Sequence, residues 1–200
     1  MNEDDAEDLV AVFLGSYGLQ TKRPSKAERR VSKTPDFRVH RNDQFCFFAE
    51  VKSVRGDDWL SRELEHASPG QIIGGARPDP VFNRLTADIH AAVKQYDAVN
   101  RNREHPNVLA LVNYDQICGL PDLLGVITGN FYADDGSRDA IYRQYSEGRM
   151  KSDRLKVDLY LWLGPRDEHH FLFTPVHQGH HLSLCSWFGK DPSAIKSVDA

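Results

Sequence analysis

The feature that most constrains the fold is a run of five apolar residues, Val108 to Val112, which follows Pro106 and ends at Asn113. An uninterrupted apolar run of this length is typical of a strand that is buried on both faces of its sheet. Such a strand needs helices over both faces, so the run favours an α/β fold. A long helix predicted at residues 81–102 has a suitable apolar face, formed by Leu85, Ile89, Ala92, Val93 and Tyr96.

The segments before this strand alternate between helix and strand patterns. The apolar residues Leu9, Val10, Val12, Phe13 and Tyr17 predict a helix at residues 4–17. A short strand at 18–23, a basic loop to Lys33, and two strands around the turn at 41–43 are expected next. Residues 55–80 are irregular, with a short helix at 57–66. The predicted order of residues 4–114 is therefore α, β, β, β, α, β.

From Gln116 the pattern changes. We expect a short helix at 121–130, three strands at 155–163, 170–176 and 181–188, and a loose tail at 190–200. The sequence thus predicts a core at residues 1–115 and a β-rich extension at 116–200, packed together as one compact unit.

Composition narrows the class of protein. The chain has 200 residues, of which 40% are hydrophobic and 27% are charged, as in ordinary globular domains. No apolar stretch approaches the roughly 18 residues that a membrane helix needs, and the acidic start is the reverse of a signal peptide. Three widely spaced cysteines, Cys46, Cys118 and Cys185, make a disulfide framework or a cysteine zinc site improbable. We therefore expect a cytoplasmic protein with reduced thiols and no membrane contact.

Three charged residues carry the chemistry of the predicted site. Glu50 and Lys52 end a strand that begins with apolar residues, and they share one sheet face because they lie two positions apart. Asp36 lies on the neighbouring strand. Carboxylates are hard oxygen ligands that suit Mg²⁺ or Mn²⁺, with the Val51 carbonyl as a further ligand. Such an ion would activate a water for phosphodiester hydrolysis, and Lys52 would position or deprotonate that water or stabilise the developing charge.

The hairpin register decides whether these carboxylates meet. Directly paired residues of antiparallel strands share a face, so Asp36 joins Glu50 only if paired residue numbers add to an even number. A regular two-residue loop at Asn42-Asp43 would pair residue 41 with 44 and turn Asp36 away. We therefore predict an odd-numbered loop or a β-bulge. Phe45, Phe47, Ala49 and Val51 are expected to face the core on the opposite side.

These residues match a known pattern. Pro35-Asp36 and Glu50-Val51-Lys52, separated by thirteen residues, resemble the two half-motifs of the PD-(D/E)XK nuclease superfamily. The resemblance implies a restriction-endonuclease-like fold, with an αβββαβ core around a central mixed sheet. It covers a little over half of the chain and assigns no branch of the superfamily, since the Gln-x-x-x-Tyr form of one branch is missing.

The resemblance also implies further site residues. An acid on the first helix often joins the metal site in this superfamily, and Glu7 is the candidate here, with Glu3 and Asp4 behind it. A helix-dipole role explains an acid at Glu7 equally well. Members also carry a lysine or glutamine on the later helix, the place of Lys94 and Gln95. A solvated helix face is the alternative reading of Gln95.

The partner implied is DNA, although the net charge of −4 excludes a generally basic protein. A local basic run supplies the predicted phosphate contacts, with a solvated loop as the alternative. Its members proposed to bind nucleic acid are Lys22, Arg23, Arg29, Arg30 and Lys33.

The leading functional hypothesis is thus a Mg²⁺- or Mn²⁺-dependent deoxyribonuclease, and a role in DNA repair or phage defence fits the resemblance. The alternative is a catalytically inactive nuclease-fold module that binds nucleic acid or protein. A homodimer or a further protein partner is compatible with either. A third hypothesis is an unrelated α/β enzyme. His177, His180 and His181 are also close together in the sequence, where turn histidines are the expectation and a metal site the alternative.

Overall fold

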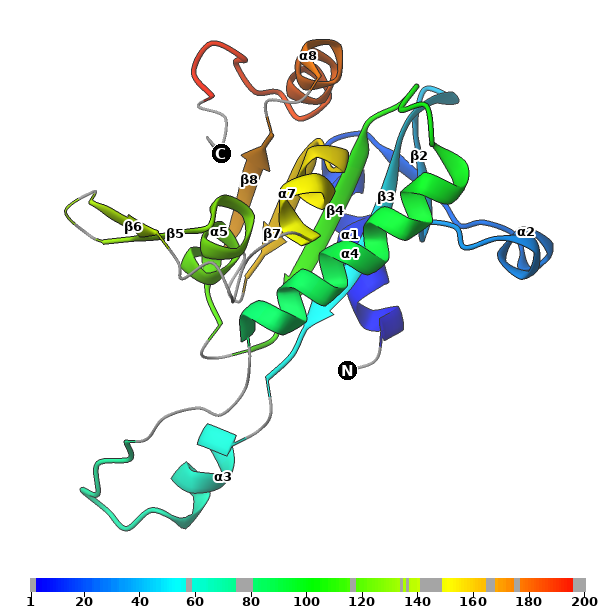
Figure 1. Ribbon diagram of the computed structural model, residues 1–200. Helices are drawn as coiled ribbons and strands as arrows, with labels where there is room; N and C mark the ends of the chain where they lie inside the picture. The colour runs from blue at the N-terminus through cyan, green and yellow to red at the C-terminus, as the bar shows by residue number, and fades with distance from the viewer. Residues whose placement is uncertain are drawn as a thin grey trace.

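The computed structural model describes residues 3–56, 59–74, 81–115, 118–133, 135, 137–140, 149–164, 168–174 and 177–195. Its centre is a six-stranded mixed sheet (Figure 1). The strands, in spatial order, are β1 (Gln20–Lys22), β2 (Phe37–Arg41), β3 (Gln44–Val54), β4 (Asn107–Asn113), β7 (Leu159–Leu163) and β8 (His169–Phe173). The α/β class predicted from the sequence is confirmed.

Two parallel pairs form the middle of the sheet, and antiparallel pairs form its sides. β3 runs parallel to β4 and β4 parallel to β7, whereas β1–β2, β2–β3 and β7–β8 are antiparallel. Every residue of β4 is buried, as its continuous apolar run predicted. β7 and β8 pair onto the same sheet as β1–β4, so the predicted boundary at residue 115 lies between neighbouring strands of one sheet.

Helices cover both faces of the sheet. Those of the first 115 residues are α1 (Glu3–Ser16), α2 (Lys26–Val31), α3 (Trp59–His66) and α4 (Val81–Val99). They are followed by α5 (Leu120–Thr128), α7 (Arg149–Asp153), the 3₁₀ turn η1 (Arg154–Lys156) and α8 (Gln178–Trp187). A small second sheet pairs β5 (Asn130–Tyr132) with β6 (Arg138–Ala140). None of the described helices combines the length and the apolar character that crossing a bilayer requires.

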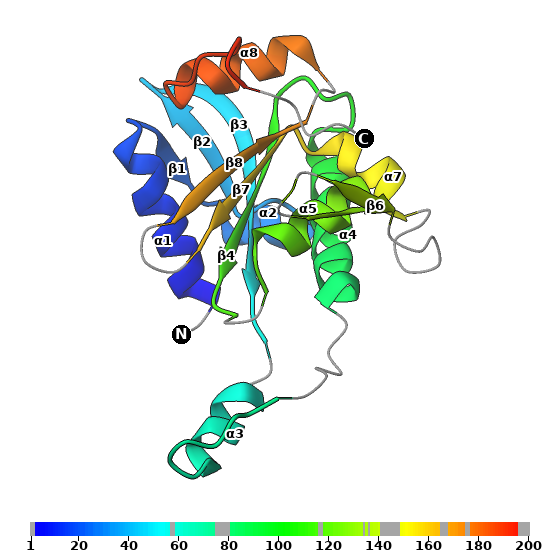
Figure 2. The same cartoon turned by 90° about the vertical axis from the view of Figure 1, so that its left-hand side faces the viewer.

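The two faces of the sheet bury separate cores. α4 and α5 pack on one face, called here the α4 face, and α1 and α8 pack on the other, called the α1 face (Figure 2). Parallel connections have one hand, so two successive crossovers that move the same way across a sheet place their helices on the same side. This explains why α4, between β3 and β4, and α5, between β4 and β7, share a face.

The hairpin between β2 and β3 contains the predicted bulge. Asn42 and Asp43 form a two-residue turn, both with positive φ (50° and 62°). Arg41 pairs with Gln44, but beyond the bulge Val39 pairs with Phe47, so Cys46 is the extra residue. From there paired numbers add to an even value, and the register places Asp36 opposite Glu50.

One consequence of the bulge corrects the sequence prediction for Phe45. We expected Phe45 to share the face of Phe47, Ala49 and Val51. It packs instead with the α4-face core, whereas Cys46 lies in the α1-face core. The extra residue reverses the alternation of side chains on its N-terminal side.

Three other expectations need correction. Residues 181–188 were expected as a strand but belong to α8, in which Leu184, Cys185 and Phe188 pack against the sheet and Leu182 is exposed. Leu182 and Leu184 alternate as in a strand, yet the helix alone accounts for their different burial. Part of the basic loop is the helix α2, which Ser25 and Glu28 cap reciprocally. The β-rich extension contains α5, α7 and α8 beside its strands.

The apolar stripe of α1 also differs from the one expected. Ala6, Val10 and Leu14, four residues apart, are buried against the sheet, whereas Leu9 and Val12 are exposed. The short helix expected at 57–66 is α3, which lies on a segment that leads away from the sheet (Figure 1). The tail is described only to residue 195.

The positive φ of Asn42 makes the hairpin turn sensitive to substitution. We predict that Asn42→Ala lowers the free energy of unfolding by about 1 kcal/mol, because a Cβ-bearing residue other than Asn or Asp is strained in the left-handed region. Asn42→Gly should cost little or nothing. Asn102→Ala, in an exposed turn without positive φ, is the control. Urea unfolding at 25 °C measures all three, and equal losses for both alanine variants would contradict the strain.

Candidate active site

The predicted carboxylates and the lysine meet on the α4 face. Glu50 is completely buried, and its Oε1 accepts a hydrogen bond from Lys52 Nζ at 2.6 Å. The other oxygen, Oε2, accepts from the backbone N–H of Asp36 at 3.2 Å. Asp36 Oδ2 in turn accepts from the backbone N–H of Val51 at 2.9 Å. The carboxylate of Glu50 therefore binds the backbone of Asp36, and the carboxylate of Asp36 binds the backbone next to Glu50.

The hydroxyl of Tyr96, on α4, binds the backbone of the two strands beside Glu50. Its hydroxyl donates to the carbonyl of Val108 at 2.6 Å and accepts from the backbone N–H of Glu50 at 3.2 Å. One buried side chain thus ties α4 to both β3 and β4 beside the buried carboxylate. Contacts with α4 therefore help to fix the position of Glu50, together with its own strand, β3.

Burial and charge perturb the ionisable groups. Burial and, to a smaller extent, the nearby negative charge of Asp36 raise the pKa of Glu50, Lys52 opposes both effects, and the net result is a pKa of about 8. Burial alone would lower the pKa of Lys52, but the attraction of Glu50 raises it above its ordinary value. Lys52 is therefore held as an ammonium at neutral pH, while the pair of carboxylates is short of positive charge.

A pocket of about 350 Å³ opens beside these residues. It lies between α4, β2, β3 and the segment that contains α2. Its lining residues are Arg29, Ser32, Lys33, Thr34, Asp36, Lys52, Ala91 and Gln95. Five of the residues predicted for catalysis or nucleic-acid binding, from three separate stretches of sequence, therefore line one cavity.

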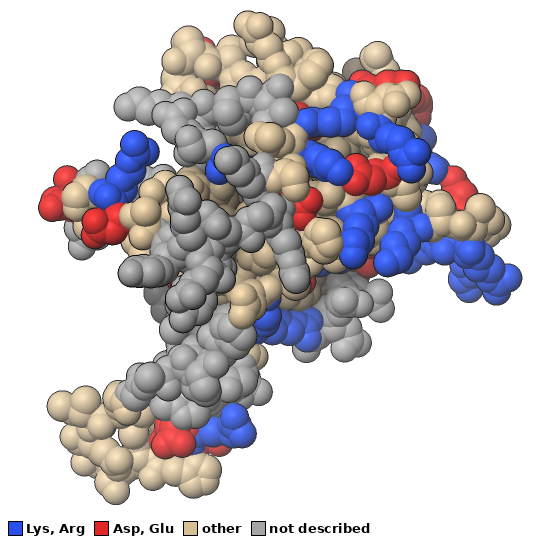
Figure 3. All heavy atoms as spheres, in the orientation of Figure 1, with Lys and Arg blue, Asp and Glu red and all other residues tan. Residues whose placement is uncertain are grey.

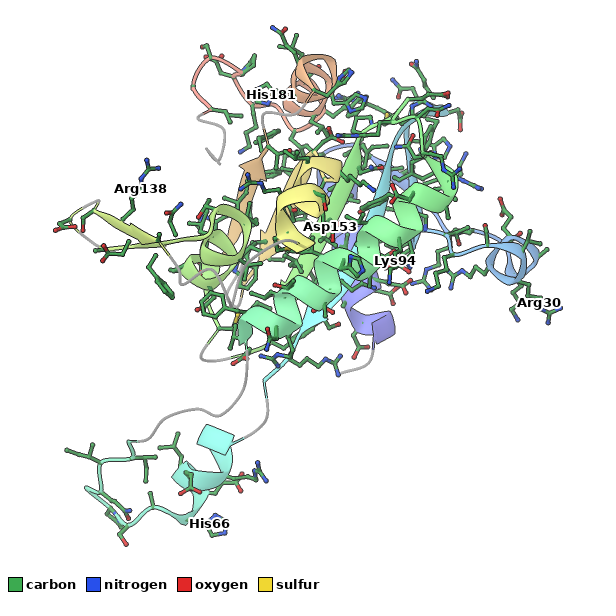
Figure 4. The ribbon with its side chains drawn as sticks, in the orientation of Figure 1. Arg30, His66, Lys94, Arg138, Asp153 and His181 are labelled. Carbon is green, nitrogen blue, oxygen red and sulfur yellow. The ribbon has the colours of Figure 1, made fainter. Side chains whose placement is uncertain are left out.

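Gln95 lies at the wall of this pocket. Its side-chain Nε2 donates to the carbonyl of Thr34 at 3.4 Å, and its Oε1 is buried with no hydrogen-bond partner among the described residues. A buried acceptor without a partner is costly, so the oxygen is suited to a donor supplied by a ligand or water. Lys94, its neighbour, is on the exposed side of α4 (Figure 4).

Sequence reasoning missed Asp88, a third carboxylate near the site. It lies on α4, seven residues before Gln95, so both occupy the same side of the helix. Burial raises the pKa of Asp88, opposed by the charges of Lys52 and Arg84. The seven-residue spacing from Gln95 was the signal available in the sequence.

The structure places other residues that were predicted for the site away from the pocket. Glu7 pairs with Arg23, with Nε and Oε2 3.2 Å apart, and Arg23 also lies over the ring of Phe37 on the α1 face. Lys22 lies 3.8 Å from Asp43 at the hairpin turn. None of these residues lines the pocket. The side chains of Glu3 and Asp4 lie outside the described part of the chain.

The basic residues of α2 and of the segment after it, which holds Lys33, point in two directions. Arg29 and Lys33 line the pocket, whereas Arg30 points away from the sheet (Figure 4). α2 is held in place by an ion pair of 2.6 Å between Glu28 and Arg38 of β2. Lys and Arg side chains gather over α2 and the far end of α4, with fewer acids among them (Figure 3).

The three histidines of α8 and its cap have separate partners. His177 Nδ1 accepts from the backbone N–H of His180, which caps the helix, and His180 Nδ1 lies 3.1 Å from Asp158 Oδ1. His181 Nε2 lies 3.6 Å from the sulfur of Cys185. Only the rings of His177 and His180 lie close to each other. The expectation of turn histidines is corrected, because His180 and His181 belong to α8 and His180 is buried.

The donors present suit a hard divalent cation. Within the described residues, no group of three or more His, Cys, Asp or Glu side chains is arranged to hold a metal ion. Asp36 and Glu50 nonetheless supply two adjoining carboxylates, and Lys52 is the cation that binds one of them directly. An oxygen-ligating cation that keeps most of its waters fits such a pair.

Comparison with known proteins found no matching family model, no similar curated protein and no similar solved structure.

The raised pKa of Glu50 predicts a pH-dependent effect of Glu50→Gln on stability. In the unfolded chain the carboxyl ionises near pH 4.5, but in the folded protein near pH 8, so the folded state loses stability between these values. We therefore expect Glu50→Gln to raise the free energy of unfolding by about 2 kcal/mol above pH 8, or about 5 °C in Tm, and by much less near pH 5.

The measurement is thermal unfolding in EDTA at both pH values. Glu63→Gln, on the exposed surface of α3, removes the same charge without burial and should show no such difference. A stability gain of Glu50→Gln that is equal at both pH values would contradict the assignment.

Proposed function

We propose that this protein is a metal-dependent deoxyribonuclease of the PD-(D/E)XK type. The observation that carries the proposal is the register of the β2–β3 hairpin, which brings Asp36, Glu50 and Lys52 together beside a pocket lined by basic residues. The restriction-endonuclease-like assignment of the core is part of the proposal. So is a role in DNA repair or phage defence, which rests on the resemblance alone.

Mg²⁺ or Mn²⁺ would be held by Asp36, Glu50 and the carbonyl of Val51. Their fit to such an ion rests on two adjoining carboxylates and on the charge imbalance at Glu50. When bound, the ion supplies positive charge to the scissile phosphate and lowers the pKa of an attacking water.

Lys52 acts as a cation in this proposal, not as a base. Its pKa is raised by Glu50, so it keeps its proton at neutral pH and stabilises the negative charge that develops on the phosphate. This favours one of the roles that the sequence left open. Gln95, with its Oε1 buried in the pocket wall, positions a water.

Arg29 and Lys33 bind the DNA backbone at the mouth of the pocket. Both side chains are exposed and carry full charge, so they contact phosphates without reading sequence. Arg30, on the other side of α2, contacts a more distant phosphate.

Cleavage of supercoiled plasmid tests the function directly. We expect nicking or linearisation with Mg²⁺ or Mn²⁺, none with EDTA, and a rate loss of at least about 100-fold for Asp36→Asn, Glu50→Gln and Lys52→Ala. Asp43→Asn and Glu63→Gln remove carboxylates from exposed positions and should cleave normally. Circular dichroism verifies that each variant is folded.

Two outcomes would count against catalysis at this site. Normal cleavage by Asp36→Asn or Glu50→Gln would refute the roles given to these residues. DNA binding without cleavage by the wild-type protein, under either metal, would favour the inactive binding module instead.

The basic residues predict a salt-dependent effect on binding. Each phosphate contact that is lost should reduce the slope of log affinity against log salt by about 0.9 on duplex DNA. We expect Arg29→Ala with Arg30→Ala to flatten this slope, with Arg29 contributing more because it lines the pocket. Cleavage at saturating DNA should survive.

Fluorescence anisotropy at several salt concentrations, with Ca²⁺ in place of Mg²⁺ to prevent cleavage, measures the slope. Arg138→Ala is the matched control, since Arg138 lies on the β5–β6 hairpin, away from α2 (Figure 4). An unchanged slope in the double variant would assign the basic run to solvation alone.

A further inference from the structure

A second cavity, of about 460 Å³, lies between the start of β3 and the segment that joins α4 to β4. Its volume is within the range of small-molecule sites. It is lined by Phe45, Phe48, Asp97, Ala98, Val99, Asn100, Arg101, Asn102, Glu104 and His105. The cavity adjoins the far end of α4 and is distinct from the pocket that contains Asp36.

Aromatic rings form one wall of this cavity. The ring of Phe45 lies 4.5 Å from His105 and 4.9 Å from Phe48, edge to face in both cases. His40 of β2 lies 5.4 Å from Phe45 on the other side. Phe45 takes part only because the bulge at Cys46 turns it to this face. Phe48 is buried, whereas Phe45 and His105 are only partly buried, so these two rings are the ones that a flat aromatic ligand would meet.

The segment that carries His105 is held in a fixed shape. The Asn100 side chain donates to the carbonyl of His105 at 2.7 Å and to Asn107 Oδ1 at 2.8 Å. Arg103, with a φ of 54°, binds Asp158 at 2.6 Å and also the carbonyl of Leu155. These contacts set the His105 ring against Phe45 before any ligand arrives, so binding orders little of the protein.

The polar residues of the cavity distinguish a base from a phosphate. Glu104 carries a carboxylate that repels a phosphate but accepts N–H groups from the edge of a nucleobase. Asp97 Oδ2 is paired with Lys156 Nζ at 2.6 Å, so its other oxygen is the one that can accept from a base. Arg101 is exposed at the rim, where it can meet the phosphate attached to such a base. The cavity thus combines a stacking wall, acceptors for base edges and one outer cation.

The cavity also lies in line with the candidate active site. The chain along β2 places every second residue on the α4 face, and these residues are Asp36, Arg38 and His40. From Asp36 to His40 the chain advances about 13 Å, a distance that a few nucleotides span. Arg38 lies between them, where Glu28 of α2 pairs with it at 2.6 Å.

We propose that this cavity binds a nucleobase of the substrate strand, a few nucleotides from the bond to be cut, so that the protein acts on DNA with unpaired nucleotides. The inference rests on the proposed nuclease function and names its substrate class. A paired base is stacked inside the duplex and cannot enter, whereas a single strand offers its base faces freely.

Binding without metal tests the cavity apart from catalysis. The probes are a short fluorescein-labelled thymidine oligonucleotide and its abasic counterpart, both in EDTA. Stacking on an aromatic side chain contributes about 5- to 100-fold per base, so the wild type should bind the base-bearing strand tighter by that factor. Phe45→Leu and His105→Ala should lose most of this difference and leave abasic binding unchanged, whereas Phe45→Tyr should keep it. Phe131→Leu, at a half-exposed ring of β5, is the matched control.

The outcomes separate this inference from the proposed function. Asp36→Asn should lose cleavage yet keep base-dependent binding, and wild-type cleavage of a single strand should exceed that of an intact duplex. Cleavage with no preference for base-bearing strands would overturn the cavity's role and leave the nuclease standing. Base-dependent binding that Phe45→Leu abolishes, without cleavage, would support the cavity and refute the nuclease.

A free nucleotide is the other source of a base. Thymidine 5′-monophosphate should displace the oligonucleotide from the wild type and not bind Phe45→Leu. If it binds the wild type without displacing the oligonucleotide, the cavity serves a free nucleotide and the inference is wrong.

Discussion

A carboxylate buried at the end of an apolar strand is the constraint on which the rest of this structure depends. Glu50 has no exposed surface, yet it lies between the hydrophobic residues of β3 and the helix that covers them. A buried charge is tolerated only when it is paired and hydrogen-bonded. Lys52, the Asp36 backbone and Tyr96 provide that environment, and each comes from a different part of the chain. The packing of β2, β3 and α4 supplies the contacts that stabilise Glu50 in its buried position.

α4 links the two cavities because different parts of it border each one. Its C-terminal part carries Gln95 at the pocket wall and Tyr96 beside Glu50, and its last residues line the second cavity before the segment that holds His105. A rigid helix that borders both sites keeps their separation constant, because moving one end would require moving the other. The mutual packing of helix and sheet, through the core residues Ile89 and Val93, makes such a movement costly.

Local patterns in the sequence predicted the elements that bury a clear stripe or run. The apolar run of β4 and the helical spacing of α4 were sufficient, because burial on two faces or on one stripe leaves a direct mark on composition. The residues Asp36, Glu50 and Lys52 were identified from their spacing and from the even-number rule for the hairpin. Residues 181–188 were predicted as a strand, but they lie mainly in α8, where Leu182 and Leu184, two positions apart, fall on opposite sides of the helix.

The features that the sequence did not predict depend on contacts between distant segments. Asp88 belongs to the site because α4 crosses the sheet near Lys52. Its seven-residue spacing from Gln95 places both on one side of the helix, but that spacing does not show that this side faces Lys52. The same holds for the cavity at His105, which requires the loop after α4 to fold back on β3. The displacement of Phe45 followed from a bulge that had been predicted, but its position at Cys46 had not. Placing an extra residue requires knowing which pairings the rest of the sheet demands.

The bulge at Cys46 also limits how the hairpin can change in length during evolution. Deleting or inserting one residue between Val39 and Phe47 would reverse the alternation and carry Asp36 to the α1 face, away from Glu50. A change of two residues would preserve the face. Lineages that keep this pair of carboxylates can therefore vary the hairpin only by even steps, or by adding a second bulge for each odd one. Whether the number of residues between Asp36 and Glu50 is odd or even is therefore constrained as strongly as the identity of these two residues.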